Sequence, residues 1–220
     1  MAVITIVGAG MMGSALAFPA RENGNEVRLV GTHLDREIIE TSKKTGRHPK
    51  FTADFPVGVS YHHIEELADA VKGADFVIGG VSSFGVDWFA DTVLPVIPDG
   101  TPVITVTKGL MDTDDGKLLT YPDLWQKKLD ELGKKLPLCA IGGPCTSYEL
   151  VAHDQTEVSF CGRDIKVLEY IKNAIEALPV TNIGHCEIKI SAYRNTEIVM
   201  RELQAAWGKE KEVKKDARNK

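Results

Sequence analysis

The sequence lacks the features that mark several classes of protein. Its 220 residues contain no apolar run that approaches the roughly 20 residues of a membrane-spanning helix, so no membrane partner is expected. A signal peptide is not expected, because the first apolar segment, which begins at Val3, is interpreted as part of the core. The formal net charge of −5 gives no reason to expect nucleic acid or an anionic membrane surface as a partner.

Cysteine is scarce: the chain has four cysteines, and no two of them form a Cys-x-x-Cys pair. Disulfides and a metal site are therefore not expected, and a reducing cytoplasm is the expected location. The hydrophobic share of 43% and the charged share of 26% are ordinary for a soluble globular chain with one large or two small domains. The cysteines are Cys139, Cys145, Cys161 and Cys186.

A glycine motif follows the first apolar run of the chain. The run Val3–Val7 ends in Gly8-x-Gly10-x-x-Gly13, and helix-forming residues follow at once. In this strand–turn–helix context the spacing predicts a site for a dinucleotide. Gly8 would allow the tight turn, Gly10 would let the backbone approach the pyrophosphate, and Gly13 would let the helix pack close to the strand.

The start of the following helix, Met11–Asn23, supplies the second part of this prediction. Free N–H groups around Met11 and Met12 are expected to face the phosphates, aided by the positive end of the helix dipole. Pro19 is expected to kink this helix, and Gly24 is expected to cap its end. The alternative interpretation is a glycine-rich turn that holds no ligand.

The end of the second predicted strand, Glu26–Val30, bears on the choice of cofactor. An NAD site usually has an acidic residue here to bind the ribose hydroxyls, but this chain has Thr32 and His33. The first acid is Asp35, which is better interpreted as the N-cap of the next helix, Arg36–Lys44. A neutral strand end with a nearby arginine could accept a 2′-phosphate, which favours NADP slightly over NAD.

Strands and helices alternate along residues 1–183, which predicts a Rossmann-like α/β domain with a doubly wound, mostly parallel sheet. Residues 184–220 are expected to form a C-terminal helical segment. Its charged helix, from about Ala192, either docks on the domain or pairs with a second subunit. Further strands are expected at 57–61, 75–79, 102–106, 138–141, 157–161 and 180–182, and further helices at 64–71, 86–93, 123–132 and 164–178.

Three segments follow strands at the edge of the sheet where ligands bind. The loop Val81–Gly85 follows one central strand, and Lys108 directly follows the next, so its cation is expected on the ligand side. The alternative is a solvated lysine at a strand end. In the third segment, Gly142–Glu149, glycines and small residues leave room for a ligand. Cys145 has no neighbouring base there and is interpreted as pocket lining rather than as a nucleophile.

These motifs occur together with other distinctive segments. The segments are Gly8–Ala17 followed by Pro19, Asn23–Arg28, Gly31–His33, His48-Pro49, Val106–Leu110 and Gly142–Glu149. In this order they resemble the N-terminal part of the NAD(P)-dependent glycerol-3-phosphate dehydrogenases, whose first helix carries the same proline. The resemblance extends over residues 8–149 and is far more specific than the glycine motif alone.

The resemblance implies a role for each matching residue at the cofactor. It places the adenosine ribose near Thr32 or His33, the nicotinamide near Lys108 and Ser147, and either NAD or NADP in the site. The residues that it implies for the pyrophosphate are Gly8, Gly10, Met11, Met12 and Gly13.

The resemblance also implies a phosphorylated small-molecule substrate beside the nicotinamide. Lys108 would contact this substrate and is a catalytic candidate, and Gly143 and Cys145 would line its pocket. Cys145 and Ser147 stand where the family usually has Ser or Thr and Ala. These replacements change the polarity of the pocket.

The resemblance weakens near the C-terminus. The family continues into a helical substrate domain, which begins with a Glu…Ala-Leu-Lys-Asn segment whose lysine is the catalytic acid/base. Residues 184–220 are interpreted as its remnant, with Arg194 in place of that lysine. Arginine has a pKa above about 12 and cannot readily exchange a proton, although Arg194 could polarise a ketone oxygen. Lys189 is the other candidate, and the family's phosphate-binding arginine is expected beyond residue 220.

Three functions remain open from these observations. The first is NAD(P)-dependent reduction of dihydroxyacetone phosphate to sn-glycerol 3-phosphate, with the helical domain supplied by a separate partner, or with the chain acting as a homodimer. The second is an NAD(P)-binding module without catalysis. The third is a reductase of another small acid, as in the 6-phosphogluconate and ketopantoate enzymes, although Lys108-Gly109 and Gly143-Pro144 argue against it.

Overall fold

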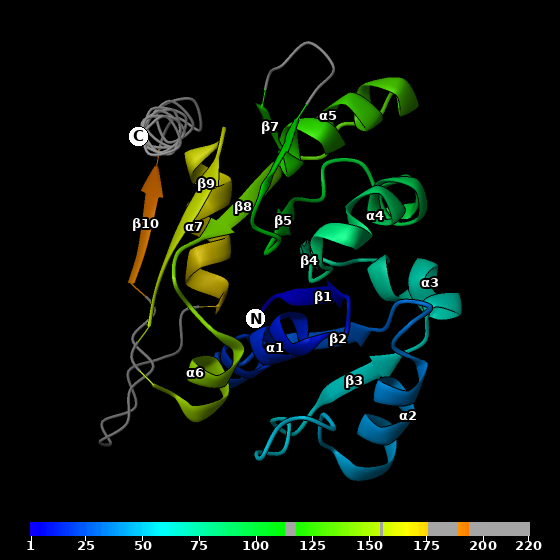
Figure 1. The fold of residues 1–220 in the computed structure, drawn as a ribbon, viewed down its shortest axis with the longest axis vertical. Coiled ribbons are helices and arrows are strands. Elements are labelled where there is room, and N and C mark those ends of the chain that lie inside the picture. The colour runs from blue at the N-terminus through cyan, green and yellow to red at the C-terminus, as the bar shows by residue number, and fades with distance from the viewer. Residues whose placement is uncertain (113–117, 155, 176–188, 194–220) are drawn as a thin grey trace, which may run out of the picture.

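The computed structural model describes residues 1–112, 118–154, 156–175 and 189–193. Its sheet strands are β1 (Val3–Val7), β2 (Glu26–Val30), β3 (Val59–His62), β4 (Phe76–Gly79), β5 (Val103–Thr105), β8 (Leu138–Gly142), β9 (Glu157–Gly162) and β10 (Lys189–Tyr193). They form one eight-stranded sheet in the order β10-β9-β8-β5-β4-β1-β2-β3, seen in Figure 1. Neighbouring strands are parallel except β8 and β9, which are antiparallel.

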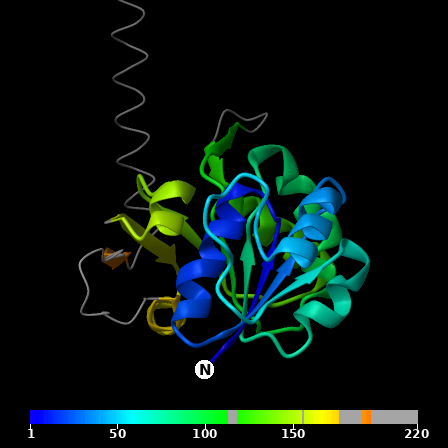
Figure 2. The same cartoon turned by 90° about the horizontal axis from the view of Figure 1, so that it is seen from below.

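Helices cover both faces of this sheet, as the two views in Figures 1 and 2 show. The helices are α1 (Met11–Glu22), α2 (Arg36–Thr45), α3 (Leu67–Val71), α4 (Val86–Thr92), α5 (Tyr121–Leu132), α6 (Ser147–Ala152) and α7 (Ile165–Ile175). Short 3-10 turns occur at η1 (Ile64–Glu66), η2 (Ser83–Gly85) and η3 (Leu94–Val96). None of the described helices is long and apolar enough to cross a membrane.

The strand β1 lies inside the sheet, between β2 and β4, and is apolar apart from the buried Thr5. Its Ile4 and Ile6 join the core beneath α1, α6 and α7, whereas Val7 joins the core beneath α3, α4 and α5. All three side chains are fully buried. A strand that is covered on both faces typically has such a nearly continuous apolar sequence. The predicted doubly wound, mostly parallel fold is therefore confirmed.

The structure differs from the sequence prediction after β5. The expected strand at 102–106 and helix at 123–132 left no regular structure between them, but residues on either side of 113–117 form an antiparallel hairpin of β6 (Leu110–Asp112) and β7 (Leu118–Thr120). Each of these strands has three residues, which is too short for an alternating pattern to stand out. The helix itself starts earlier, at Tyr121, because Thr120 caps it through the N–H of Asp123.

The structure differs from the predicted start of the C-terminal helix. The charged helix was expected from about Ala192, but Ala192 and Tyr193 belong to strand β10, which pairs with β9. The sequence Lys189–Tyr193 alternates too briefly to be separated from the helical pattern that follows it. The expected strand at 180–182 and the remainder of the expected helix lie outside the described residues. The domain boundary at residue 183 stays a prediction.

A pair of asparagines joins α7 to the first strand–helix–strand unit. The Asn25 side chain, 3% exposed, accepts from the N–H of Ala2 at 2.8 Å and donates to the carbonyls of Ala20 and Ala174. Asn23 also donates to the Ala174 carbonyl, at 2.9 Å. The last carbonyls of a helix have no partner within it, so these amides satisfy groups at the end of α7. They thereby fix the α7 side of the sheet to α1.

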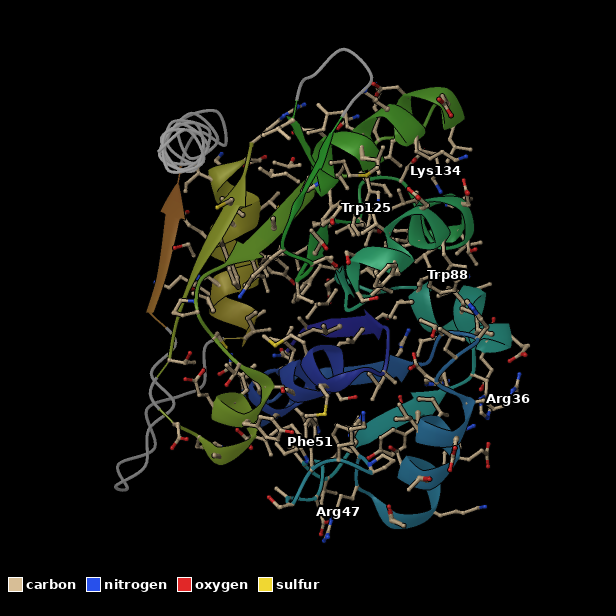
Figure 3. The ribbon with its side chains drawn as sticks, in the orientation of Figure 1. Arg36, Arg47, Phe51, Trp88, Trp125 and Lys134 are labelled. Atoms are coloured by element: carbon tan, nitrogen blue, oxygen red, sulfur yellow. The ribbon has the colours of Figure 1, made fainter. Side chains whose placement is uncertain are left out.

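Trp125 of α5 anchors the core on the other face. Its ring is fully buried and stacks on Phe89 of α4, with centroids 4.4 Å apart and planes 13° from parallel. Figure 3 labels Trp125 on α5. Its Nε1–H donates to the carbonyl of Val86 at 3.1 Å. The aromatic stack and this hydrogen bond together hold α5 against α4.

Trp125→Ala is expected to lower the free energy of unfolding by about 3–5 kcal/mol, because it leaves a cavity beside Phe89. Trp125→Phe keeps a ring there but loses the Nε1–H bond to the Val86 carbonyl and part of the ring volume, so its expected cost is smaller, about 1–3 kcal/mol. Urea denaturation followed by circular dichroism measures both. Equal losses for the two variants would contradict a role for the stacked ring.

Candidate functional site

Three glycines pack the first turn against the loop after β4. Gly8 has φ +112°, which favours glycine, and a Cβ there would lie 2.7 Å from the carbonyl carbon of Gly80. A Cβ on Gly13 would lie 2.1 Å from the carbonyl oxygen of Gly8, and one on Gly80 would lie 2.8 Å from Cα of Gly13. Gly8 and Gly13 thus have the geometry that their spacing predicted. Gly80 was missed, although the Gly79-Gly80 doublet at a strand end was its signal.

Gly10 differs from these three glycines because space is open around it. It is the N-cap of α1, in extended conformation, and a Cβ placed on it would meet no atom within 4 Å. No side chain caps α1, and its first turn has no acidic residue. The first intrahelical bond runs from the Ser14 N–H to the Gly10 carbonyl at 2.9 Å, so the N–H groups of Met11 and Met12 precede it. Such a helix start attracts anions.

A cavity of about 410 Å³ opens directly in front of this helix start. It lies where β1, β4 and β5 end, which is the ligand-binding edge of a parallel sheet. Predicted residues Gly10, Met11, Met12, Lys108 and Cys145 are brought together in its wall. The full lining is Gly10, Met11, Met12, Gly80, Val81, Ser82, Ser83, Val106, Thr107, Lys108, Ile141, Cys145 and Val158.

Lys108 contributes the cationic group of this cavity. Its Nζ donates to the carbonyl of Gly143, which places two predicted substrate residues in contact. The backbone before it is fixed, because the Thr107 hydroxyl donates to the Val81 carbonyl at 2.6 Å. A cation therefore lies at the mouth of the cavity, held between the ends of β5 and β8.

Cys145 forms part of the cavity wall and is 6% exposed. Burial raises the pKa of its thiol, which keeps the sulfur protonated and weakly nucleophilic near neutral pH. This environment agrees with its interpretation as pocket lining. Two polar residues that follow Cys145 stabilise a helix: Thr146 and Glu149 form a capping box for α6. The hydrogen bond from the Thr146 N–H lowers the pKa of the Glu149 carboxyl.

Helix α6 begins within the segment Gly142–Glu149, and the role of Ser147 at the nicotinamide stays a prediction. Ser147 is the first residue of this helix and is not in the cavity wall. The capping pattern of Thr146 and Glu149 was visible in the sequence, and it explains that part of the segment without a ligand. The segment thus approaches the cavity through Gly143 and Cys145.

The residues after β2 lie away from the cavity wall. The backbone N–H and hydroxyl of Thr32 donate to Asp35 Oδ2 at 2.8 and 2.7 Å. The ring of His33 lies 5.6 Å from that of Trp88 on α4. The catalytic candidate Arg194 lies outside the described residues, and of Lys189 only the backbone position in β10 is described.

Asp35 takes the predicted N-cap position of α2, but its side chain makes no capping bond to that helix. Its Oδ2 instead accepts from the N–H of Ala9 at 3.1 Å, inside the glycine turn. The carbonyl of Ala9 in turn is bound by Ser14 and by His48, which is 1% exposed. Sequence spacing could not reveal these contacts, since they join three segments that are distant in the chain.

No group of three or more His, Cys, Asp or Glu side chains among the described residues could hold a metal ion. The cavity instead combines exposed backbone amides, an apolar wall and one lysine. These groups fit the diphosphate and ring portions of a dinucleotide.

Comparisons with known proteins agree with this class of fold. Residues 3–167 match the family described as NAD-dependent glycerol-3-phosphate dehydrogenase N-terminus. An NADP(+)-dependent glycerol-3-phosphate dehydrogenase of Archaeoglobus fulgidus is 34% identical over 158 residues, 72% of this chain and 46% of the relative. A glycerol-3-phosphate dehydrogenase [NAD(P)+] of Escherichia fergusonii is 27% identical over 205 residues, 93% of this chain and 56% of the relative.

A solved structure shares the fold. The glycerol-3-phosphate dehydrogenase of Coxiella burnetii superposes with a TM-score of 0.71 at 20% identity, over 88% of this chain and 54% of that one. Fold and site together define a Rossmann-like α/β protein with a dinucleotide-type glycine turn. The chain belongs to the family of the NAD-dependent glycerol-3-phosphate dehydrogenase N-terminus, and it spans about half the length of the curated relatives it matches.

Two glycine variants compare a closely packed position, Gly13, with an open one, Gly10. Gly13→Ala would force a Cβ against the Gly8 carbonyl and is expected to cost more than about 3 kcal/mol, as severe backbone clashes do. Gly10→Ala meets no neighbour and is expected to cost about 0.5 kcal/mol or less, as a change at an N-cap. Thermal melting measures both variants. Similar melting temperatures would contradict the close packing of α1 on the turn.

Proposed function

We propose that this chain binds NAD or NADP across the glycine turn and acts as an NAD(P)-dependent oxidoreductase. The observation that carries the proposal is the uncapped start of α1, which faces a cavity at the carboxyl edge of the sheet with open space at Gly10. In this arrangement Gly10, Met11 and Met12 present their backbone to the diphosphate. The apolar wall with Val106, Ile141 and other residues provides a dry surface for the nicotinamide.

The proposed substrate is dihydroxyacetone phosphate, with sn-glycerol 3-phosphate as the product. Support comes from family membership and from relatives that are named glycerol-3-phosphate dehydrogenases. Because those relatives are about twice as long, we propose that catalysis uses a helical domain in addition to the described one. A separate partner chain or a homodimer could supply it. The thiols of Cys139, Cys145 and Cys161 are free, which supports a reducing cytoplasm as the proposed location.

The cofactor, when bound, supplies the hydride for the carbonyl carbon of the substrate. The residues of this chain bind and orient the reactants. Lys108, held by the Gly143 carbonyl at the cavity mouth, provides a positive charge for the substrate's oxygen or phosphate. The buried thiol of Cys145 excludes water from the wall without reacting. Arg194 is retained as the proposed group that polarises the ketone.

The second candidate is an NAD(P)-binding module without turnover. This candidate is supported by the cavity wall, which has backbone groups suited to a cofactor but, among the described residues, no cationic side chain apart from Lys108. A reductase of another small acid is a third candidate. Both share the cofactor site with the first, so cofactor binding is the first point to test.

Calorimetric titration of the purified chain with NADH and with NADPH tests the cofactor site. Binding of at least one is expected, and Gly10→Ala is expected to weaken it at least about tenfold, equivalent to 1.4 kcal/mol, because its methyl group intrudes where the diphosphate approaches. Absence of binding to either cofactor would overturn the proposal. Oxidation of the bound cofactor on addition of dihydroxyacetone phosphate then distinguishes a dehydrogenase from a binding module.

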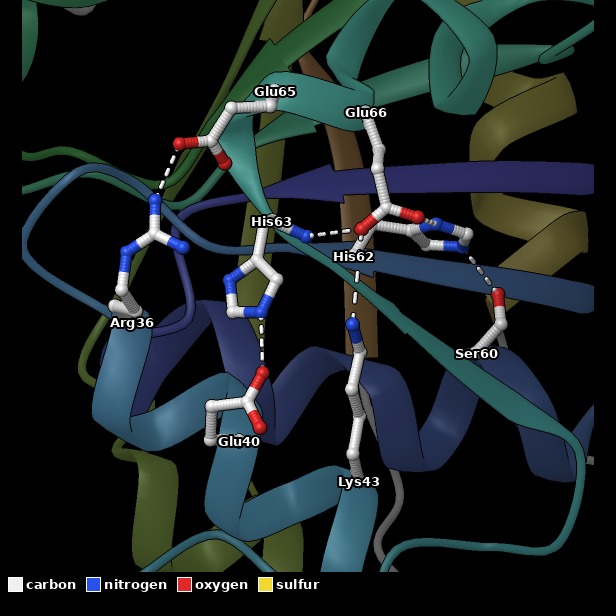
Figure 4. A network of polar contacts seen from close by, with 8 residues as sticks. All are labelled: Arg36, Glu40, Lys43, Ser60, His62, His63, Glu65 and Glu66. Carbon is white, nitrogen blue, oxygen red and sulfur yellow. Dashed lines mark hydrogen bonds and ion pairs between the residues drawn. The ribbon is translucent and has the colours of Figure 1, made fainter.

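The choice between NAD and NADP is proposed to depend on Arg36. This residue begins α2, directly after the loop that follows β2, and it forms an ion pair with Glu65 (Figure 4). Both side chains are well exposed, at 59% and 61%. The Glu65 N–H and the Arg36 guanidinium both lower the pKa of the Glu65 carboxyl, so the pair is charged near neutral pH. A 2′-phosphate would have to compete with Glu65 for the guanidinium.

Glu65→Gln is expected to raise the affinity for NADPH relative to NADH by about two- to fivefold, the range of an exposed ion pair. The matched control is Glu40→Gln, because Glu40 belongs to the same network but pairs with His63 at 2.5 Å. Competitive titration with the two cofactors gives the ratio. An unchanged ratio in Glu65→Gln, or an equal change in Glu40→Gln, would remove Arg36 from cofactor selection.

A further inference from the structure

Three side chains from separate segments converge on one residue of the glycine turn, Ala9. Asp35 Oδ2 accepts from its N–H at 3.1 Å. Its carbonyl oxygen accepts from Ser14 Oγ at 3.0 Å and from His48 Nε2 at 3.2 Å. Ser14 and His48 are 0% and 1% exposed, so these bonds are shielded from water. Both polar groups of Ala9 are therefore held by side chains.

The orientation of the Ala9 carbonyl determines where the next amide points. A trans peptide is planar, with its C=O and its N–H on opposite sides. The Ala9 carbonyl is directed into the protein, at His48 and Ser14, so the N–H of Gly10 in the same peptide is directed the opposite way. Gly10 lies in the cavity wall, and nothing fills the space beside its Cα. The buried bonds thus aim an amide donor at the cavity.

The hydrogen bonds of His48 also fix its tautomer. The N–H of Lys50 donates to Nδ1 at 3.1 Å, so Nδ1 is an acceptor and the ring proton resides on Nε2. The ring packs on Phe51, with centroids 4.6 Å apart. Only this neutral tautomer can donate to the Ala9 carbonyl while accepting from Lys50. A second proton, on Nδ1, would break the bond from Lys50.

We propose that His48 is a positioning residue for the diphosphate of the cofactor: its Nε2–H bond to the Ala9 carbonyl holds the Gly10 N–H toward the cavity. This inference rests on the proposed function. His48 touches neither cofactor nor substrate in this role. It acts through the Ala9–Gly10 peptide, with Ser14 as the second donor to the same carbonyl and Asp35 holding the preceding peptide.

Two matched variants separate positioning from packing. In His48→Gln the side-chain amide N–H can reach the position of Nε2 and donate to Ala9. In His48→Asn the shorter side chain can accept from the Lys50 N–H but cannot reach the Ala9 carbonyl. Both variants lose the ring contact with Phe51, so their losses of packing are similar. Thermal melting of both variants provides the control for folding.

The measurement is calorimetric titration with NADH and with ADP-ribose, which contains the diphosphate but no nicotinamide. His48→Asn is expected to bind both ligands about five- to tenfold more weakly, the effect of one hydrogen bond of about 1 kcal/mol. His48→Gln is expected to stay within about threefold of the parent chain, a difference below one such bond. Equal affinities of the two variants would overturn the positioning role, whereas no binding of NADH or NADPH by the parent chain would overturn the proposed function itself.

A pH series adds an independent readout. Burial lowers the pKa of His48 from its ordinary value of 6.5, and the charged groups that face the ring are Lys50 and Asp35. Neutral His48 therefore persists above pH 6.5, and proton uptake at lower pH breaks the bond from Lys50. The Nε2–H that binds the Ala9 carbonyl is present in both protonation states, so the affinity of the parent chain for NADH is expected to follow the same pH profile as that of His48→Gln on either side of pH 6.5. A parent-chain affinity that falls more steeply than that of His48→Gln at lower pH would show that the bond from Lys50, and not the Nε2–H bond, orients the turn.

Discussion

The close approach of three backbone segments at Gly8, Gly13 and Gly80 is the constraint on which the site depends. No side chain beyond hydrogen fits at these positions, because a Cβ would come within 2.1 to 2.8 Å of neighbouring backbone atoms. The contact brings α1 down onto the ends of β1 and β4. The start of the helix has no side-chain cap and opens toward the cavity. The same close approach of the glycines therefore explains both the packing of α1 and the position of its free N–H groups at the cavity.

The polar groups around Ala9 add direction to this packing. Glycine permits many backbone conformations, so a glycine turn by itself does not hold its amides in one orientation. Asp35, Ser14 and His48 remove that freedom by binding the N–H and the carbonyl of the residue between two glycines. A preorganised donor loses less entropy when a ligand binds. The glycines leave space for the ligand, and the buried side chains fix the orientation of the backbone amides.

Sequence reasoning gave the parallel sheet, most strand positions and the glycine turn, since these depend on local apolar runs and on spacing. It placed Lys108 and Cys145 at the edge that holds the cavity, because strand ends meet at one edge of a parallel sheet. It missed the contacts of Gly80 and His48 and misjudged the side chain of Asp35. These depend on which distant segments meet, which no local pattern contains. The hairpin β6–β7 and strand β10 were too short to be distinguished by periodicity.

The position of Gly80 has a consequence for the order in which the chain assembles. Strand β4 enters the sheet beside β1, with β2 on the other side of β1, so the contact spans more than sixty residues of sequence. Contacts with a large sequence separation form slowly, because closing the intervening loop costs chain entropy. The first βαβ unit alone therefore lacks one wall of the cavity. A cofactor mimic that binds this turn would act as a reporter of the native long-range topology rather than of early local structure.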